Sequence, residues 1–358
     1  MGREHIENLK RIKGATVTAI SDPVEESRSR ATELIDGEVA HFEDHRGLLD
    51  SGLVDAVIIA TPNFSHVEIL QDALATELHV FIEKPLCTTI EDCLAVIKWS
   101  QNRTGLVWMG LEYRYMPPVA ELIRIVRSGG IGEVQQVSIR EHREPFYPKV
   151  GNWNRFRAKT GGTLVEKCCH YFNLMDHITN ERPIRVFASG GQRVNFLEET
   201  YDGERSDMLD SAYVIVEYAS GKTAMLDLCM FAENTFDKEH ISVTGDKGKV
   251  ESFLPSLEVR HGERAAVGNF KEWNHDANKP KELKVRKVQD ESIEYQGFHY
   301  GASYLEHKKF FTAIREGGKP EVTLEDGLRS VATGLAAHLS IAESRPVLMS
   351  EILPAGWN

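Results

Sequence analysis

The sequence predicts an α/β protein of two domains, the first with a parallel sheet wrapped by helices and the second with a mixed, mainly antiparallel sheet. Its 358 residues exceed the usual size of one hydrophobic core. Residues 15–110 alternate short apolar runs with helical periodicity, which is typical of βαβ units. Beyond residue 115 longer strand-like runs are separated by turn signals, which indicates antiparallel hairpins. We therefore expect domains at residues 1–115 and 116–358.

Each predicted strand of the first domain ends in a short polar segment. The strands at residues 15–20, 56–60 and 79–82 end at Ser21-Asp22-Pro23, Thr61-Pro62-Asn63 and Glu83-Lys84-Pro85. Helical spacing at residues 25–35 and 65–75 connects them, and Thr88-Thr89-Ile90-Glu91 offers an N-cap to a further helix. Because open α/β sheets bind ligands beyond the carboxyl ends of their strands, these polar segments contain the candidate site residues.

The second domain is predicted to begin with a helix at residues 119–127 and to end with helices at 303–315 and 324–342. Residues 262–290 have little periodicity and predict extended surface structure. The strands between these elements are expected at residues 134–140, 184–189, 212–218, 223–229 and 240–244.

Composition and charge exclude several classes of protein. The formal net charge of -12, without a basic cluster, argues against a nucleic-acid partner. No apolar run is long enough to span a bilayer and the N-terminus carries no signal region, so we expect no membrane association and a cytoplasmic location. Five cysteines without framework spacing predict reduced thiols.

Two of the polar segments are candidates for contact with a dinucleotide. A carboxylate at Asp22 would accept hydrogen bonds from the adenosine ribose and repel a 2'-phosphate, which favours NAD over NADP. The alternative, capping of the next helix, is the stronger interpretation of Asp22 taken alone. The Asn63 amide could face a cofactor, with Pro62 stiffening the loop, although helix capping explains Asn63 equally well.

Two further segments are candidates for proton chemistry. Lys84 could stabilise an alkoxide, but lysines beside prolines are also common on surfaces. If the segment after Gly161-Gly162 is helical, Glu166 and His170 share one face, and the carboxylate would raise the basicity of the imidazole. A surface pair, or a buried histidine with satisfied hydrogen bonds, is the alternative and the stronger one on this segment alone.

No metal site is expected. The adjacent thiols of Cys168 and Cys169 cannot readily both reach one tetrahedral zinc ion. No second pair of Cys or His follows at ligand spacing.

Four motifs in order carry a resemblance to a known family. They are Ala60-Thr61-Pro62-Asn63 with His66, Glu83-Lys84-Pro85, residues 153–155 leading to Gly161-Gly162 and His170, and a tail at residues 304–311 and 324–327. In this order the chain resembles, over nearly its whole length, the Gfo/Idh/MocA family, the glucose-fructose oxidoreductase and inositol dehydrogenase group. The resemblance implies an N-terminal Rossmann domain and a C-terminal α/β domain whose large open sheet often mediates dimers or tetramers. It also implies a tightly held nicotinamide cofactor.

The resemblance also implies roles for individual residues. Lys84 matches the lysine that binds the reacting hydroxyl, and His170 the histidine that exchanges its proton. Glu166 occupies the place of a carboxylate, commonly Asp, that helps to position the substrate. The remaining residues match positions that bind the cofactor (Gly2, Asp22, Thr61, Pro62, Asn63, His66, Glu83 and Arg114) or line the substrate pocket (Trp153, Arg155 and Tyr304).

The sequence departs from the family pattern at three places. Glu166 is one methylene longer than Asp, and Asn173 stands where the family often has Asp. Of the G-x-G-x-x-G phosphate turn only Gly2 is present. We expect Met1 to be an internal methionine of a longer protein, in which preceding residues supply a first strand and the turn.

The expected activity is NAD-dependent oxidation of a secondary hydroxyl on a sugar or cyclic polyol, with Lys84, His170 and Glu166 as catalytic residues. One alternative is a glycosidase of the same family that uses NAD transiently. Another is a non-catalytic regulator that binds a dinucleotide or sugar. The presence of both Lys84 and His170 favours an enzyme, since a regulator needs neither.

Overall fold

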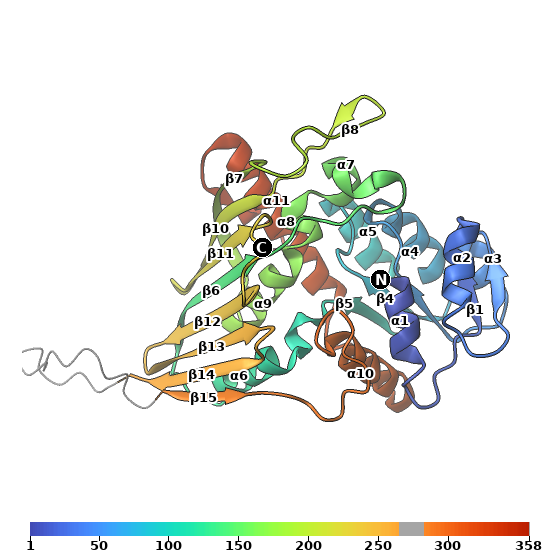
Figure 1. The fold of residues 1–358 in the computed structure, drawn as a ribbon, viewed down its shortest axis with the longest axis horizontal. Helices are drawn as coiled ribbons and strands as arrows, with labels where there is room; N and C mark the ends of the chain where they lie inside the picture. The colour runs from blue at the N-terminus through green and yellow to red at the C-terminus, as the bar shows by residue number, and fades with distance from the viewer. Residues whose placement is uncertain (265–282, 358) are drawn as a thin grey trace, which may run out of the picture. The chain divides into compact units, whose positions relative to one another are not determined.

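The computed structural model describes residues 1–264 and 283–357, which group into two compact units (Figure 1). Unit 1 comprises residues 1–115, 148–173 and 291–335. Unit 2 comprises residues 116–147, 174–290 and 336–358, apart from the residues not described. We predicted a boundary between two domains at residues 115 and 116. The compact units are defined by contacts and not by independent folding, so this boundary stays a prediction.

Unit 1 contains two parallel sheets, which confirms the predicted Rossmann-type architecture. Strands β1 (Ala19–Ser21) and β2 (Ala40–Phe42) form one sheet, and β3 (Ala56–Ile59), β4 (His79–Glu83) and β5 (Val107–Gly110) form the other. Strand β1 begins four residues later than predicted, and β2 and β5 were not predicted. The central position of β4 explains its composition, because Val80, Phe81 and Ile82 are all fully buried.

Helices flank these strands in unit 1 (Figure 1). The predicted N-cap of α5 is confirmed, since the Thr89 hydroxyl accepts a hydrogen bond from the Asp92 N–H. The helical elements are α1 (Gly2–Leu9), α2 (Glu25–Thr32), α3 (His45–Leu49), η1 (Asn63–Ser65), α4 (His66–Leu74), α5 (Ile90–Trp99), η2 (Glu112–Tyr115), η3 (Val150–Arg155), α7 (Arg157–Thr160), α8 (Thr163–Glu166) and α10 (Ala302–Glu316). Helices α9 (Cys169–Thr179) and α11 (Leu324–Glu343) each contribute residues to both units.

Unit 2 is built on one sheet with the strand order β15-β14-β13-β12-β6-β11-β10-β7-β16 (Figure 1). Among the strand pairs of this sheet in residues 1–264 and 283–357, β6 and β11 alone are parallel, which confirms the predicted mixed, mainly antiparallel sheet. Its strands are β6 (Val134–His142), β7 (Pro183–Gly191), β10 (Ser211–Tyr218), β11 (Thr223–Cys229), β12 (Glu239–Gly245), β13 (Gly248–Leu254), β14 (Glu258–Glu263), β15 (Lys284–Lys287) and β16 (Val347–Leu348). A separate hairpin joins β8 (Thr200–Tyr201) to β9 (Glu204–Arg205), and η5 (Met349–Glu351) follows β16.

The segment at residues 262–290 is only partly described. It was predicted to be extended surface structure, and residues 284–287 agree, since they form the exposed strand β15, which pairs with β14. Residues 265–282 lie outside the described part of the chain.

The two faces of the unit 2 sheet differ in burial. Along β10 the side chains of Ala212, Val214 and Val216 are buried, whereas Tyr213 and Ile215 are exposed. This alternation is the normal consequence of the two-residue period of a strand. Helix α6 (Pro117–Arg127) packs on β13 and β14, which covers part of one face. In residues 1–264 and 283–357, no helix combines the length and apolar character that crossing a bilayer requires.

Candidate active site

Lys84 lies directly beyond the carboxyl end of β4, as predicted. Its ammonium donates a hydrogen bond of 2.8 Å to the backbone carbonyl of Glu166, and its side chain is half-buried. Burial alone would lower the pKa of Lys84, but the carboxylates of Glu166, Glu83 and Glu112 and the thiol of Cys169 raise it well above its ordinary value. Lys84 is therefore a charged ammonium at neutral pH.

The Glu166 carboxylate is held by groups from two other segments of unit 1. The Asn63 amide donates to one carboxylate oxygen and also, at 3.1 Å, to the Thr160 carbonyl, while Lys149 lies 3.3 Å from the other oxygen. Burial opposes ionisation of Glu166, but Lys84, Lys149 and the Asn63 amide lower its pKa to about 2. Asn63 thus binds Glu166 through its side chain, whereas neither η1 nor α4 uses it as a side-chain cap.

The expected pairing of Glu166 with His170 on one helical face is wrong. The helix after Gly162 is broken at residues 167 and 168, so that Glu166 ends α8 and His170 lies in α9. Gly161 and Gly162 both have positive φ, and a Cβ at Gly161 would lie 2.7 Å from the Val165 side chain. The two glycines make the tight turn into α8, but the helical register does not continue to His170.

His170 is almost fully buried, with 2 % of its surface exposed. Its ring stacks on Tyr113 with 3.9 Å between ring centroids and an interplanar angle of 6°. The carboxylate beside it is Glu112, whose Oε2 lies 3.8 Å from His170 Nδ1. Burial, together with the charges of Lys84 and Lys167, lowers the pKa of His170 well below its ordinary value, so the imidazole is neutral.

Sequence reasoning missed the groups that surround His170. Glu112 and Tyr113 lie directly after β5, Lys167 donates to the Tyr113 hydroxyl, and His299 lies 3.3 Å from Glu112 Oε1. Burial, with the nearby Glu83 charge, raises the pKa of Glu112 to about 8. The signal was available, since Glu112 follows a strand end like the other candidates, but β5 itself was not predicted.

The expected cofactor residues fall into two groups by exposure. Asp22 is half-buried and accepts a 2.8 Å hydrogen bond from the Val24 N–H through Oδ1, while Val24 holds the N-cap position of α2. Thr61 and Pro62 are also half-buried, and a Cβ on Gly2, the first residue of α1, would meet no atom within 4 Å. None of these four positions is fully buried, so each is accessible to a ligand.

His66 and Glu83 lie inside unit 1 instead. Both ring nitrogens of His66 face backbone carbonyls, at 2.8 Å from Pro85 and 3.1 Å from Thr61. Glu83 pairs with His5 at 2.9 Å and accepts from the Lys84 N–H at 3.1 Å. The buried His66 and Glu83 side chains therefore bind the segments that follow β3 and β4, and they hold Thr61 and Lys84 in place.

The remaining predicted residues line unit 1 at several places. Arg114 donates to Asn173 Oδ1 at 2.7 Å, so Asn173 supports Arg114. The Trp153 ring packs edge-on against Phe64 and lies beneath the Lys149 ammonium, which is bonded to Glu166. Arg155 is buried, and Tyr304 lies on α10 with the Lys308 ammonium 5.9 Å from its ring centre.

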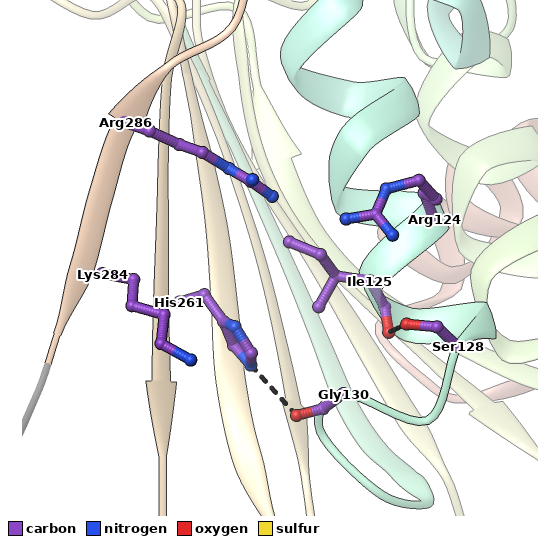
Figure 2. A pocket seen from close by; sticks show the side chains of 7 residues that line it. All are labelled: Arg124, Ile125, Ser128, Gly130, His261, Lys284 and Arg286. Atoms are coloured by element: carbon purple, nitrogen blue, oxygen red, sulfur yellow. Dashed lines mark hydrogen bonds between the residues drawn. The ribbon is translucent and has the colours of Figure 1, made fainter.

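A cavity of about 250 Å³ lies in unit 2 and contains none of these residues (Figure 2). Its basic side chains are compensated, because Arg124 and Arg286 both bind the Glu121 carboxylate and His261 contacts the Gly130 carbonyl at 3.0 Å. Throughout the described ranges, no three His, Cys, Asp or Glu side chains are arranged to hold a metal ion.

Two family models match the chain in the order that the fold requires. Residues 1–111 match the model described as oxidoreductase family, NAD-binding Rossmann fold, and residues 123–349 match the oxidoreductase family, C-terminal alpha/beta domain. The chain belongs to the Gfo/Idh/MocA family. It is an oxidoreductase, and the resemblance inferred from the four motifs is confirmed.

Individual proteins are similar to the chain over almost its full length. The chain is 28 % identical to a myo-inositol 2-dehydrogenase of Thermotoga maritima, covering 99 % of this chain and 97 % of the relative. It is 26 % identical to a 2,7-anhydro-N-acetylneuraminate hydratase of Escherichia coli, covering 95 % and 92 %. A crystal structure of a probable dehydrogenase from Thermotoga maritima superposes with a TM-score of 0.75 at 25 % identity, covering 98 % and 96 %.

Proposed function

We propose that the protein oxidises a secondary hydroxyl of a sugar or cyclic polyol with NAD. The observation that carries this proposal is that two neighbouring groups in unit 1 differ in charge, one being a cation and the other neutral. Lys84 is held as an ammonium while His170 is held as a neutral imidazole. One fixed cation and one free base are what removal of an alcohol proton needs.

Lys84 acts as the electrostatic group. Its ammonium, kept charged by the Glu166 carboxylate, stabilises negative charge that develops on the substrate oxygen. Glu166 acts through Lys84 and not through His170, since its carboxylate binds Asn63 and Lys149. The hydrogen bond between His66 Nδ1 and the Pro85 carbonyl holds the Glu83-Lys84-Pro85 segment in place.

His170 acts as the base. One ring nitrogen, Nδ1, faces Glu112, which leaves Nε2 to accept the proton of the substrate hydroxyl. Stacking on Tyr113 fixes the plane of the ring, so that the accepting lone pair is oriented before the substrate binds.

The residues of unit 1 fit a nicotinamide dinucleotide at two of its parts. The Asp22 carboxylate has one oxygen engaged by Val24 and can accept from the adenosine ribose with the other. Thr61 and Pro62 follow β3 and are half-buried, so they could contact a bound cofactor. When bound, the nicotinamide supplies the hydride acceptor for the carbinol carbon.

A polyol or sugar substrate is supported by the relatives. A myo-inositol 2-dehydrogenase is similar over nearly the full chain, and its name gives a secondary alcohol of a cyclic polyol as the substrate. The hydratase similar to this chain favours one alternative, a reaction on a sugar derivative without net oxidation. Net accumulation of NADH separates the two activities.

The test is NAD reduction, measured by absorbance, with a panel of inositols, aldoses and anhydrosugars. We expect reduction with at least one of them. Lys84→Met and His170→Asn should each lower turnover roughly a hundredfold or more with little change in NAD affinity, because a general base or a fixed charge commonly contributes that much. Wild-type turnover in both variants would contradict the proposal.

A further inference from the structure

The buried position of His170 raises the question of where its proton goes. With 2 % of the residue exposed, the ring has no direct contact with bulk water. An imidazolium formed there is unfavourable, because burial and the charges of Lys84 and Lys167 oppose it. A base that serves repeated turnovers needs a neighbour that takes the proton onward.

Two buried polar atoms face each other beside the ring. His170 Nδ1 and Glu112 Oε2 are 3.8 Å apart, and within the described residues neither has a hydrogen-bond partner. Unpaired buried polar atoms are costly, so two of them in facing positions point to a proton that passes between them. A side-chain movement of less than 1 Å would bring the pair to hydrogen-bond length.

The other oxygen of Glu112 leads towards the surface. Oε1 lies 3.3 Å from His299 Nδ1, and the His299 side chain is 20 % exposed. His299 Nδ1 is also 3.9 Å from Glu4 Oε1, so two carboxyl groups lie beside the ring. The series His170, Glu112 and His299 therefore runs from a buried base to a residue in contact with solvent.

We propose that Glu112 is a proton-relay residue that takes the Nδ1 proton of His170 and passes it through His299 to water. This inference rests on the proposed function of His170 as the base. As His170 Nε2 accepts the substrate proton, the Nδ1 proton moves to Glu112 Oε2 and the carboxylate becomes a carboxylic acid. The carboxyl group turns and donates this proton to His299 Nδ1. The resulting imidazolium releases one proton to solvent, so all three groups return to their starting charge and His170 keeps its proton on Nε2. After the product leaves, Nδ1 regains a proton through the same series and Nε2 releases its proton to water in the vacated substrate site, which restores the starting tautomer.

The relay predicts a pH dependence whose sign follows from Glu112. Its pKa is raised to about 8 by burial and by Glu83, so below that pH the carboxyl group already carries a proton and cannot accept another. Turnover should therefore rise as the pH increases through about 8. The ionisable groups that act on or lie beside Glu112 are Glu83 at the end of β4, Lys84 directly after β4, Lys167 before α9, Cys169 and His170 on α9, His299 before α10 and Glu306 on α10.

The first experiment compares Glu112→Gln with a matched control, Glu306→Gln. Glutamine keeps the shape of Glu112 and can accept from His170 Nδ1, but it cannot pass a proton on. We expect kcat to fall about tenfold or more at unchanged KM, with loss of the rise near pH 8. Glu306 is equally buried, lies outside the series of His170, Glu112 and His299, and accepts a hydrogen bond of 3.1 Å from the Trp108 indole, which glutamine can also accept. Its replacement should therefore leave turnover high and the rise with pH in place. Wild-type kcat and an intact rise in Glu112→Gln would overturn the relay.

The second experiment does not depend on activity. In protein with labelled histidines, the NMR signals of His170 should shift as the pH passes about 8 and should lose this shift in Glu112→Gln. If the chemical shifts of His170 do not change as Glu112 ionises near pH 8, the relay is overturned even if the enzyme is active. If no substrate reduces NAD, the proposed function fails, while the NMR titration still decides whether the two groups are coupled.

A third variant covers the case in which Glu112→Gln does not fold. His299→Ala alters the solvent end of the series, and added imidazole can replace the lost ring. We expect reduced kcat that rises again with imidazole concentration, whereas the Lys84→Met enzyme should not respond. Undiminished kcat in His299→Ala would show that protons leave by another route.

Discussion

The environments of single residues decide which groups of unit 1 can react. Lys84 and His170 are both enclosed, yet Lys84 is surrounded by carboxylates and His170 by an aromatic ring and cations. Burial penalises the charged form of each, and only Lys84 has enough opposite charge nearby to stay ionised. The same two residue types in exchanged surroundings would lose both proposed roles.

At the scale of single residues, Asp22 allows a test of the preference between NAD and NADP. We expect NAD to be used more efficiently than NADP, since a carboxylate beside the ribose repels a 2'-phosphate. Asp22→Ser should narrow the ratio of kcat/KM values by roughly tenfold, the effect of removing about 1.4 kcal/mol of repulsion. Steady-state kinetics with both cofactors measure the ratio. Equal use of NADP by the wild type would contradict the assignment of Asp22.

At the scale of elements, strands with strong apolar character were predictable and short or polar ones were not. The runs that became β3, β4, β10 and β11 are rich in Val, Ile and Leu. By contrast β2 has three residues and β15 reads Lys-Val-Arg-Lys, so neither carries a pattern of its own. Such strands form because a neighbouring strand offers hydrogen bonds, which one segment of sequence does not reveal.

The candidate site was predictable only where the strand before each site residue was itself predicted. Lys84, Asn63 and Asp22 follow predicted strands, and the rule that ligands bind at strand ends found them. Glu112 was missed together with β5. The pairing of Glu166 with His170 failed because spacing alone cannot reveal the break at residues 167 and 168. Partners such as Lys149 and His299 come from distant segments that only the folded chain brings together.

At the scale of the whole molecule, the exposed face of the unit 2 sheet predicts self-association. Ile215 pairs across the sheet with Phe187 on β7 and Met225 on β11, and their exposed fractions are 43 %, 41 % and 39 %. Adjacent Tyr213 is 63 % exposed. A row of apolar side chains in water is typical of a protein interface, so the predicted homodimer or homotetramer would bury this face.

Ile215→Glu tests this interface, because it places a charge at the centre of the row. We expect a smaller assembly than for the wild type by analytical ultracentrifugation. Val285→Glu is the matched control, since Val285 is also exposed but lies on β15 at the opposite edge of the sheet. An unchanged assembly in Ile215→Glu, or a monomeric wild type, would argue against this face as the interface.

The most direct test of the central claim follows the hydrogen on the carbinol carbon. The best substrate of the panel, deuterated at that carbon, is incubated with the protein and NAD, and the products are analysed by NMR and mass spectrometry. The account predicts deuterium on the nicotinamide ring, with one equivalent of ketone formed for each NADH. Deuterium retained in the sugar or lost to water, without net NADH, would contradict oxidation of the hydroxyl as the reaction of this site.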